Sequence, residues 1–318
     1  MILALAGGVG GSKLANGLAT CLAPSELVVA VNTGDDFEHL GLFVSPDLDT
    51  VMYTLAGRNN RITGWGRADE TWHFMDAIAE LGGATWFRLG DRDLAIHVER
   101  TRRLRDGETL SEITRGLCEV FGVAHRIVPM CDEPVATMLE TDRGRLPFQH
   151  YLVREGSAPV VSSVGFAGVE AATPSAGFAA ALVDPRLEAI VIAPSNPFLS
   201  IGPILAVPGV REGIVAAQVP VVAVSPIIAG EAVKGPAAKM MLEFGQEPSA
   251  ATIGKIYAGL LDGLVIDDRD NSLRGEIEAQ GLRVHVTDTL MHGPEDQARL
   301  AREVLAFCRR IASSRRTR

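Results

Sequence analysis

The chain has 318 residues, of which 47% are hydrophobic and 22% are charged, and this balance excludes an intrinsically disordered protein. Its 30 basic and 39 acidic residues give a net charge of −9, so broad electrostatic binding to nucleic acid or to an anionic membrane is not expected. The cysteines show no CxxC spacing and are expected to be free thiols. No signal peptide and no apolar run of membrane-spanning length is recognised, which predicts a cytoplasmic protein.

Short apolar runs separated by helical patterns predict the fold class. The first run, residues 1–6, ends in a glycine-rich turn, and a helix with Ser12 as its cap is predicted over residues 12–22. Further buried strands are predicted at residues 27–32, 126–129, 189–193, 219–225, 263–267 and 283–287. Continuous apolar strands alternating with helices are typical of a parallel sheet covered on both faces. The sequence therefore predicts an α/β fold.

The segment between the second and third of these strands has a different character. Residues 51–124 contain four helical patterns and all three tryptophans, so we predict a mainly helical insertion there and a core made of residues 1–50 and 125–318. A β-hairpin is predicted from residues 136–140 and 144–151. A terminal helix is predicted at about 294–311, and the basic segment 309–318 is expected to be a frayed, solvated end.

A glycine-rich turn follows the first strand and opens the first helix. Gly7, Gly8, Gly10 and Gly11 allow backbone amides to approach an anion, and the helix N-terminus adds partial positive charge. Lys13 adds a full charge nearby. The spacing matches neither GxGxxG nor GxxxxGK[ST]. The pattern favours phosphate binding, with a purely structural tight turn as the alternative.

Four carboxylates lie close together in the sequence after the second strand. They are Asp35, Asp36, Asp47 and Asp49, and such a group beside a phosphate would need Mg²⁺ or protons to offset the repulsion. The alternative is that Asp35 forms a turn and Asp49 caps a helix. Considered together with the glycine-rich turn, they favour a functional site.

Three further segments each have two possible interpretations, one functional and one structural. In WFRLGDRDLAIHVER, arginines such as Arg88 and Arg92 either face a ligand or belong to a salt-bridged surface helix. Ser195 and Asn196, which follow a core strand, suit base or ribose recognition, or form an ordered turn. Lys234 is either a phosphate ligand or, as the pattern favours, a surface lysine.

Several long motifs, in order from Met1 to about Met291, resemble those of the CofD family, the 2-phospho-L-lactate transferases of coenzyme F(420) biosynthesis. They include GGVGGSKLANGL, VNTGDDFEHLGLFVSPDLDTVMYTLAG, FRLGDRDLAIHVERT, APSNPFLSIGPIL and SPIIAGEAVKGPAAKMM. The resemblance implies a Rossmann-like, three-layer core with a helical insertion, a homodimer, and Mg²⁺ as the metal.

The resemblance also implies a reaction. The terminal ribityl hydroxyl of the deazaflavin Fo attacks the distal phosphorus of a guanosine diphosphate-linked three-carbon acid (phospholactyl, phosphoenolpyruvyl or phosphoglyceryl), and GMP leaves. An upstream guanylyltransferase is implied as the source of the donor. The family would contact Fo at Asp49 and Arg88, and would hold the guanosine diphosphate at the glycine-rich turn and at Ser195 and Asn196.

The acidic residues are assigned more loosely. Asp35 and Asp47 are predicted as metal ligands, and Asp49 and Asp36 as catalytic residues near the attacking hydroxyl. A YvcK-like protein, which would bind a nucleotide sugar and regulate rather than catalyse, is the alternative. An NAD-dependent dehydrogenase is disfavoured because the fingerprint spacing is absent.

Overall fold

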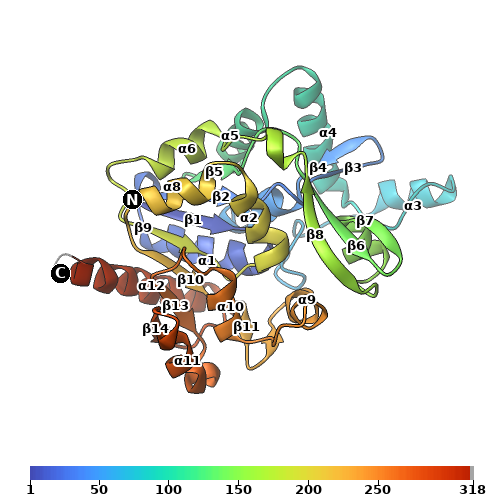
Figure 1. The fold of residues 1–318 in the computed structure, drawn as a ribbon. Coiled ribbons are helices and arrows are strands. Elements are labelled where there is room, and N and C mark those ends of the chain that lie inside the picture. The colour runs from blue at the N-terminus through green and yellow to red at the C-terminus, as the bar shows by residue number, and fades with distance from the viewer. Residues whose placement is uncertain (316–318) are drawn as a thin grey trace.

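Seven strands form one parallel sheet in the computed structural model, which describes residues 1–315 (Figure 1). Their order is β14-β13-β10-β9-β1-β2-β5, and every neighbouring pair is parallel. The strands are β1 (Ile2–Ala6), β2 (Leu27–Val31), β5 (Arg126–Pro129), β9 (Ala189–Ile192), β10 (Val221–Val224), β13 (Gly263–Ile266) and β14 (Arg283–Val286). The predicted α/β fold with a Rossmann-like parallel sheet is confirmed.

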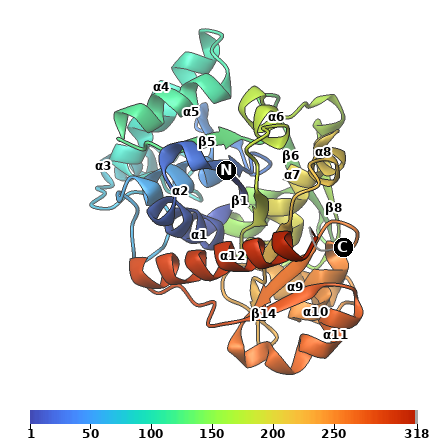
Figure 2. The same cartoon turned by 90° about the vertical axis from the view of Figure 1, so that its left-hand side faces the viewer.

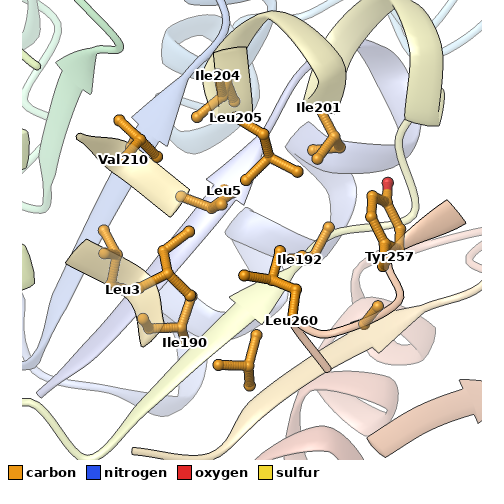
Figure 3. Close-up of a cluster of buried hydrophobic side chains, with 14 of the residues drawn as sticks. Leu3, Leu5, Ile190, Ile192, Ile201, Ile204, Leu205, Val210, Tyr257 and Leu260 are labelled. Atoms are coloured by element: carbon orange, nitrogen blue, oxygen red, sulfur yellow. The ribbon is translucent and has the colours of Figure 1, made fainter. Parts of the chain in front are cut away.

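The side chains of each central strand alternate between two buried clusters, one on each face of the sheet. Leu3 and Leu5 of β1 belong to the first cluster, whereas Ile2 and Ala4 belong to the second. Figure 3 shows the first cluster, in which Leu3 and Leu5 lie beside the isoleucines of β9 and the helical segment that follows it. Because both faces are covered, the strands are apolar along their whole length.

Helices form the two outer layers. The second cluster is covered by α1 (Gly8–Cys21), α2 (Pro46–Leu55), α5 (Leu110–Val120) and α12 (Pro294–Arg315). Figure 2 shows α12 crossing the molecule beside α1, and a methyl group at Gly17 of α1 would collide with the backbone of Gln297. The first cluster is covered by α6 (Ala176–Leu182), α7 (Gly202–Ala206), α8 (Val210–Ala216), α9 (Ala237–Glu243), α10 (Ala250–Ile256) and α11 (Arg274–Ala279).

Smaller elements extend from these layers. β7 (Gly144–Pro147), β6 (Ala136–Thr141) and β8 (Val161–Ala167) form an antiparallel sheet, while β3 (Phe37–His39) pairs with β4 (Leu42–Val44), and β11 (Ile227–Ile228) with β12 (Glu231–Ala232). The remaining helices are α3 (His73–Glu80) and α4 (Asp91–Arg105). Short 3₁₀ turns occur at η1 (Pro24–Glu26), η3 (Val169–Ala171) and η5 (Asp268–Leu273), and π-helical turns at η2 (His150–Arg154) and η4 (Pro197–Ile201).

The first helix begins earlier than predicted. α1 starts at Gly8, so most of the glycine-rich turn forms its first turn, and Gly7 rather than Ser12 stands at the N-cap. The Ser12 hydroxyl donates instead to the Val9 carbonyl, 3.0 Å away. Glycine is a weak helix former, but tertiary contacts of this segment, described below, override that weakness.

The predicted hairpin and terminal helix also need correction. The hairpin's second strand ends at Pro147, and a third strand, β8, which pairs with β6 along its length, was not predicted. The terminal helix continues to Arg315, whose guanidinium pairs with Asp262. The frayed end predicted from residue 309 is therefore wrong for residues 309–315, and residues 316–318 lie outside the described part of the chain.

The predicted insertion contains helices of two kinds. Its flanking helices, α2 and α5, share the second buried cluster with β1 and β2, and α4 adds Ile96 to it, whereas α3 extends outward in Figure 1 and places Met75 in a separate small cluster. The division into core and insertion at residues 51 and 124 stays a prediction. Among residues 1–315, no single helix is long and apolar enough to cross a membrane, and only the bent pair Pro197–Ala206 and Val210–Ala216 meets that test jointly.

Candidate active site

The candidate active site lies at the edge of the sheet, at the point where the strand order reverses. From β1 the chain builds outward through β2 and β5, then returns to place β9 on the other side of β1. Ligands of open parallel sheets bind at such a switch point, at the carboxyl ends of the strands. A cavity of about 670 Å³ opens there, and its lining includes Gly7 after β1, Asp35 after β2, Ser195 after β9 and Ser225 after β10.

The glycines of the first turn bring β1 and α1 against the end of β9. A methyl group at Gly10 would collide with the Pro194 carbonyl oxygen, and one at Gly11 would lie 2.6 Å from Ser195 Oγ. Ser195 Oγ in turn accepts from the Gly7 amide at 3.2 Å and donates to the Gly7 carbonyl at 2.7 Å. These glycines and Ser195 therefore hold the two loops together, which is a structural role alongside any contact with a ligand.

The first turn of α1 still offers hydrogen-bond donors. The Gly8 amide donates to Asp47 Oδ1 at 2.7 Å, but the amides of Val9 and Gly10 have no partner within the helix because of their position in its first turn. Asn196 adds another donor, since its Oδ1 accepts from two backbone amides of η4 while its buried Nδ2 has no partner among the described residues. Val9, Gly10 and Asn196 all line the cavity.

Three carboxylates form what we call the acidic wall, defined as Asp35, Asp36 and Asp47. Asp35 and Asp47 line the cavity. Asp36 is not among the lining residues of the described chain, and its Oδ2 accepts from Ser45 Oγ at 2.9 Å. Asp47 accepts from Gly8 and from Asn32 Nδ2 at 3.0 Å. None of the three forms an ion pair in residues 1–315, so no protein cation in contact offsets the charge that the wall carries when it is ionised.

Burial raises the pKa of each acidic-wall carboxyl. For Asp47 it raises the pKa to about 6, against the hydrogen bonds from Asn32 and Gly8. For Asp35 burial is again the largest cause, followed by the charge of Asp47, and the pKa lies well above its ordinary value. Burial likewise raises the pKa of Asp36 well above its ordinary value. Such groups either keep a proton or require a cation.

The acidic wall fits a divalent cation. Asp35 Oδ1 and Asp36 Oδ1 are buried and have no hydrogen-bond partner in residues 1–315. Carboxylate oxygens are the ligands that Mg²⁺ prefers, usually one or two together with substrate phosphates and water. Asp35 and Asp47, the predicted metal ligands, are the members that face the cavity.

Asp49 belongs to a different arrangement, which we call the paired cluster and define as Asp49, Asp93, His97 and Arg100. The buried Arg100 guanidinium donates to both Asp49 oxygens. His97 Nδ1 lies 3.8 Å from Asp49 Oδ2, and His97 Nε2 lies 3.6 Å from Asp93 Oδ2. Asp49 lies in the first turn of α2 and does not cap it. Its side chain is thus fixed before any ligand arrives.

The contact between Arg100 and Asp49 was not predicted from the sequence. The spacing of residues 93, 97 and 100 at i, i+4 and i+7 does indicate that they share one face of a helix. The sequence could not show that α2 packs against that face. Asp49, Asp93 and His97 also bring potential ligand atoms within 4.8 Å of one another. Because Arg100 already neutralises Asp49, this cluster is less suited to a cation than the acidic wall.

Arg88 and several aromatic rings border another part of the same cavity. The Arg88 guanidinium lies over the Trp72 ring, 4.2 Å from its centroid, and is otherwise exposed. Phe87 is buried and Trp65 is 48% exposed, and both line the cavity. Trp72 stacking holds Arg88 without using its hydrogen-bond donors, which remain available to a ligand.

Both cavity lysines donate to backbone carbonyls. Lys13 Nζ donates to the Met291 carbonyl at 2.7 Å. Lys234, interpreted from sequence as a surface lysine, is exposed but also lines the cavity, where it donates to the Thr63 carbonyl. Every residue predicted as a site except Asp36 and Gly11 thus lines the cavity.

Comparison with known proteins identifies the family. The family model described as 2-phospho-L-lactate transferase CofD matches residues 2–304. The chain is 40% identical over 316 residues to a phosphoenolpyruvate transferase of Streptomyces coelicolor, covering 98% of each chain. It is 38% identical over 304 residues to a 2-phospho-L-lactate transferase of Methanosarcina mazei, covering 96% of this chain and 99% of that relative.

A solved structure with the same fold comes from a more distant protein. A member of the UPF0052 family from Bacillus halodurans superposes with a TM-score of 0.61 at 14% sequence identity, covering 96% of this chain and 98% of that one. At this identity the likeness shows the fold alone. The family match and the two sequence relatives span nearly the whole chain, and the chain is therefore a member of the 2-phospho-L-lactate transferase CofD family.

Proposed function

We propose that the protein transfers a phosphate-linked three-carbon acid from its guanosine diphosphate-linked donor to the terminal ribityl hydroxyl of Fo. An oxygen–phosphorus bond forms between that hydroxyl and the distal phosphorus, the bond to the bridging oxygen breaks, and GMP leaves. Family membership supports a transferase of this type. One observation carries the proposal. Amides that can donate hydrogen bonds to a phosphate, carboxylates without an ion pair, and an arginine all line one cavity.

The donor is proposed to bind along the first turn of α1. The amides of Val9 and Gly10 point their donors at the N-terminal end of the helix, where the helix dipole also favours a phosphate. Asn196 offers its unpartnered Nδ2 to the nucleotide. Ser195 is proposed to position the glycine-rich turn and not to contact the donor itself, because its hydroxyl already donates to the Gly7 carbonyl.

The acidic wall is proposed to hold Mg²⁺ through Asp35 and Asp47. Bound there, the ion would neutralise charge that develops on the phosphoryl oxygens during transfer. The proton of the attacking hydroxyl is proposed to pass to Asp36, the carboxylate of the acidic wall that does not hold the ion. Burial raises the pKa of Asp36, which makes it a better proton acceptor, and this role requires that a ligand or water reach it past Ser45.

The acceptor is proposed to lie between Arg88 and the paired cluster. Asp49 has both oxygens engaged by Arg100, so it orients a hydroxyl by accepting a further hydrogen bond and is poorly placed to act as the base. Arg88 offers donors held in one plane by Trp72. Phe87 and Trp65 supply apolar surface that a flat deazaflavin ring would cover.

Mass spectrometry of the products tests this function. The purified protein is incubated with Fo, Mg²⁺, a guanylyltransferase with GTP, and phospholactate, phosphoenolpyruvate or phosphoglycerate in turn. We expect an Fo adduct with one of these acids and equimolar GMP, and the best donor identifies the acid. Absence of adduct and of GMP with all three acids would refute the function. Binding of a nucleotide sugar without binding of Fo would support the regulatory alternative.

The assay needs a variant that leaves the cavity intact. Lys255→Met serves this purpose, because Lys255 pairs with Glu276 and neither residue lines the cavity. Its turnover is expected to equal that of the unmodified protein. The homodimer, the cytoplasmic location and the upstream guanylyltransferase stay predictions, and light scattering of the purified protein tests the first of them.

A further inference from the structure

The lysines of this chain fall into two classes. The chain contains four lysines, and the two that lie away from the cavity are paired, Lys239 with Glu243 and Lys255 with Glu276. Lys13 and Lys234 line the cavity, and within residues 1–315 neither forms an ion pair. Each donates only to a backbone carbonyl, which leaves a full positive charge without a counter-ion beside a cavity large enough for a ligand.

The two unpaired ammonium groups lie near each other and near the first turn of α1. A methyl group built at Gly64 would lie 2.6 Å from Val9 Cγ1 and 3.5 Å from Lys234 Nζ, so Lys234 reaches over the same turn whose amides lack helical partners. Lys13 lies one helical turn beyond Val9. Burial, and then the charge of Lys13, lower the pKa of Lys234. An anion placed between the lysines would remove that repulsion.

We infer that Lys13 and Lys234 form a two-cation seat for the diphosphate of a nucleotide, and that Lys234 leaves the Thr63 carbonyl to reach it. That this nucleotide is the donor rests on the proposed function. A diphosphate presents charge on two adjacent groups, so it engages both lysines together with the amides of Val9 and Gly10. A single carboxylate or a nucleoside offers no such pair of charges.

The contact that Lys234 gives up connects two loops across the cavity. Thr63 belongs to a loop that also carries Ile62, which is 96% exposed, and Trp65, which is 48% exposed. Lys234 lies on the loop before α9 and contacts the Thr63 loop by donating to the Thr63 carbonyl. Diphosphate binding would therefore release the loop that carries Trp65. The anion seat and the neighbouring aromatic border of the cavity are coupled through one side chain.

Calorimetric titration with GDP, GMP and guanosine tests this inference without requiring turnover. The variant is Lys234→Met, which keeps most of the side-chain length, and Lys255→Met is the matched control. Loss of one charge-assisted hydrogen bond predicts that Lys234→Met binds GDP roughly 10-fold to 100-fold more weakly. Its affinity for guanosine, and the GDP affinity of Lys255→Met, should be unchanged. Lys234→Arg should recover part of the loss.

A second measurement follows Trp65 directly. The difference in fluorescence between the protein and its Trp65→Phe variant isolates this tryptophan, and GDP should change that signal in the unmodified protein but not in Lys234→Met. Equal GDP affinity of Lys234→Met and the unmodified protein would overturn the inference, as would an equal loss of GDP and guanosine binding. If Lys234 governs GDP binding but no Fo adduct forms, the inference stands and the proposed function fails.

Discussion

The acidic wall and the paired cluster contain carboxylates that lie close in sequence but differ in how their charge is balanced. Asp49 in the paired cluster has a buried arginine on both oxygens. In the acidic wall, Asp35 and Asp36 each keep a buried oxygen without a partner in residues 1–315. Burial alone does not separate them, since Asp35 and Asp49 are 6% and 4% exposed.

This difference shows which carboxylates are structural supports and which require something from outside the chain. A buried carboxylate paired with arginine is a fixed acceptor whose position is set by the fold. A buried carboxylate without a cation is costly when ionised, and the cost is relieved by a proton or a metal ion. The paired cluster is therefore complete without a ligand, whereas the acidic wall is completed by one.

Removing the cation of the paired cluster should have the largest effect. Arg100→Met leaves Asp49 buried and unpaired, which we expect to lower the free energy of unfolding by about 3–5 kcal/mol. Urea denaturation measures this loss. Arg102→Met on the same helix is the control, because Arg102 pairs with Glu99 and Asp106 at the surface, and it should change stability little. Similar losses in both variants would contradict the distinction between buried and exposed pairs.

The acidic wall predicts a pH-dependent stability of the metal-free protein. The pKa of Asp47 is about 6 in the folded state, against 3.8 as its ordinary value, so the folded state holds the proton more tightly. The resulting stabilisation is complete below about pH 4 and is lost as pH rises through 6, by up to about 3 kcal/mol.

Urea denaturation in the presence of a chelator, at several pH values from 4 to 8, measures this dependence. Asp47→Asn should make the decline shallower, and Mg²⁺ should raise stability at pH 8 in the unmodified protein more than in the variant. A decline of the same slope in Asp47→Asn would show that Asp47 does not titrate as described.

The close approach of the glycine-rich turn to β9 should be the next most sensitive feature. Gly10→Ala places a methyl group against the Pro194 carbonyl, and relief of that overlap is expected to cost about 1–3 kcal/mol. Gly165→Ala is the matched control, since nothing lies within 4 Å of a methyl group there. Thermal denaturation compares the two, and equal melting temperatures would mean that the loops separate freely.

The smallest expected effect concerns Arg88, which is fixed by stacking rather than by an ion pair. Trp72→Leu removes a cation–π contact worth about 0.5–1 kcal/mol, which corresponds to a roughly 2-fold to 5-fold higher KM for the acceptor. The kcat should stay nearly constant in steady-state assays with Fo. A larger fall in kcat than in Arg88→Ala would show that Trp72 acts on the substrate directly.

Much of the fold, and the membership of the family, could be predicted from the sequence. The apolar runs at residues 1–6 and 189–193 correspond to β1 and β9, and the resemblance to the CofD family is confirmed. The β8 strand was missed, because its sequence VSSVGFA contains serines and a glycine and its stability comes from pairing with β6. Strand propensity depends on such neighbours more than on the residues themselves.

The sequence by itself determined which residue types gather at the carboxyl ends of the strands, because parallel strands direct those ends to one edge. Tertiary structure alone decided how they are used. It placed the Gly8 amide in hydrogen-bond contact with Asp47, and the Ser195 hydroxyl with the Gly7 carbonyl. It also paired Asp49 with Arg100 and brought Lys234 over the first turn of α1. Each of these depends on which helices and loops pack together, and contacts between distant segments are set by packing rather than by local pattern.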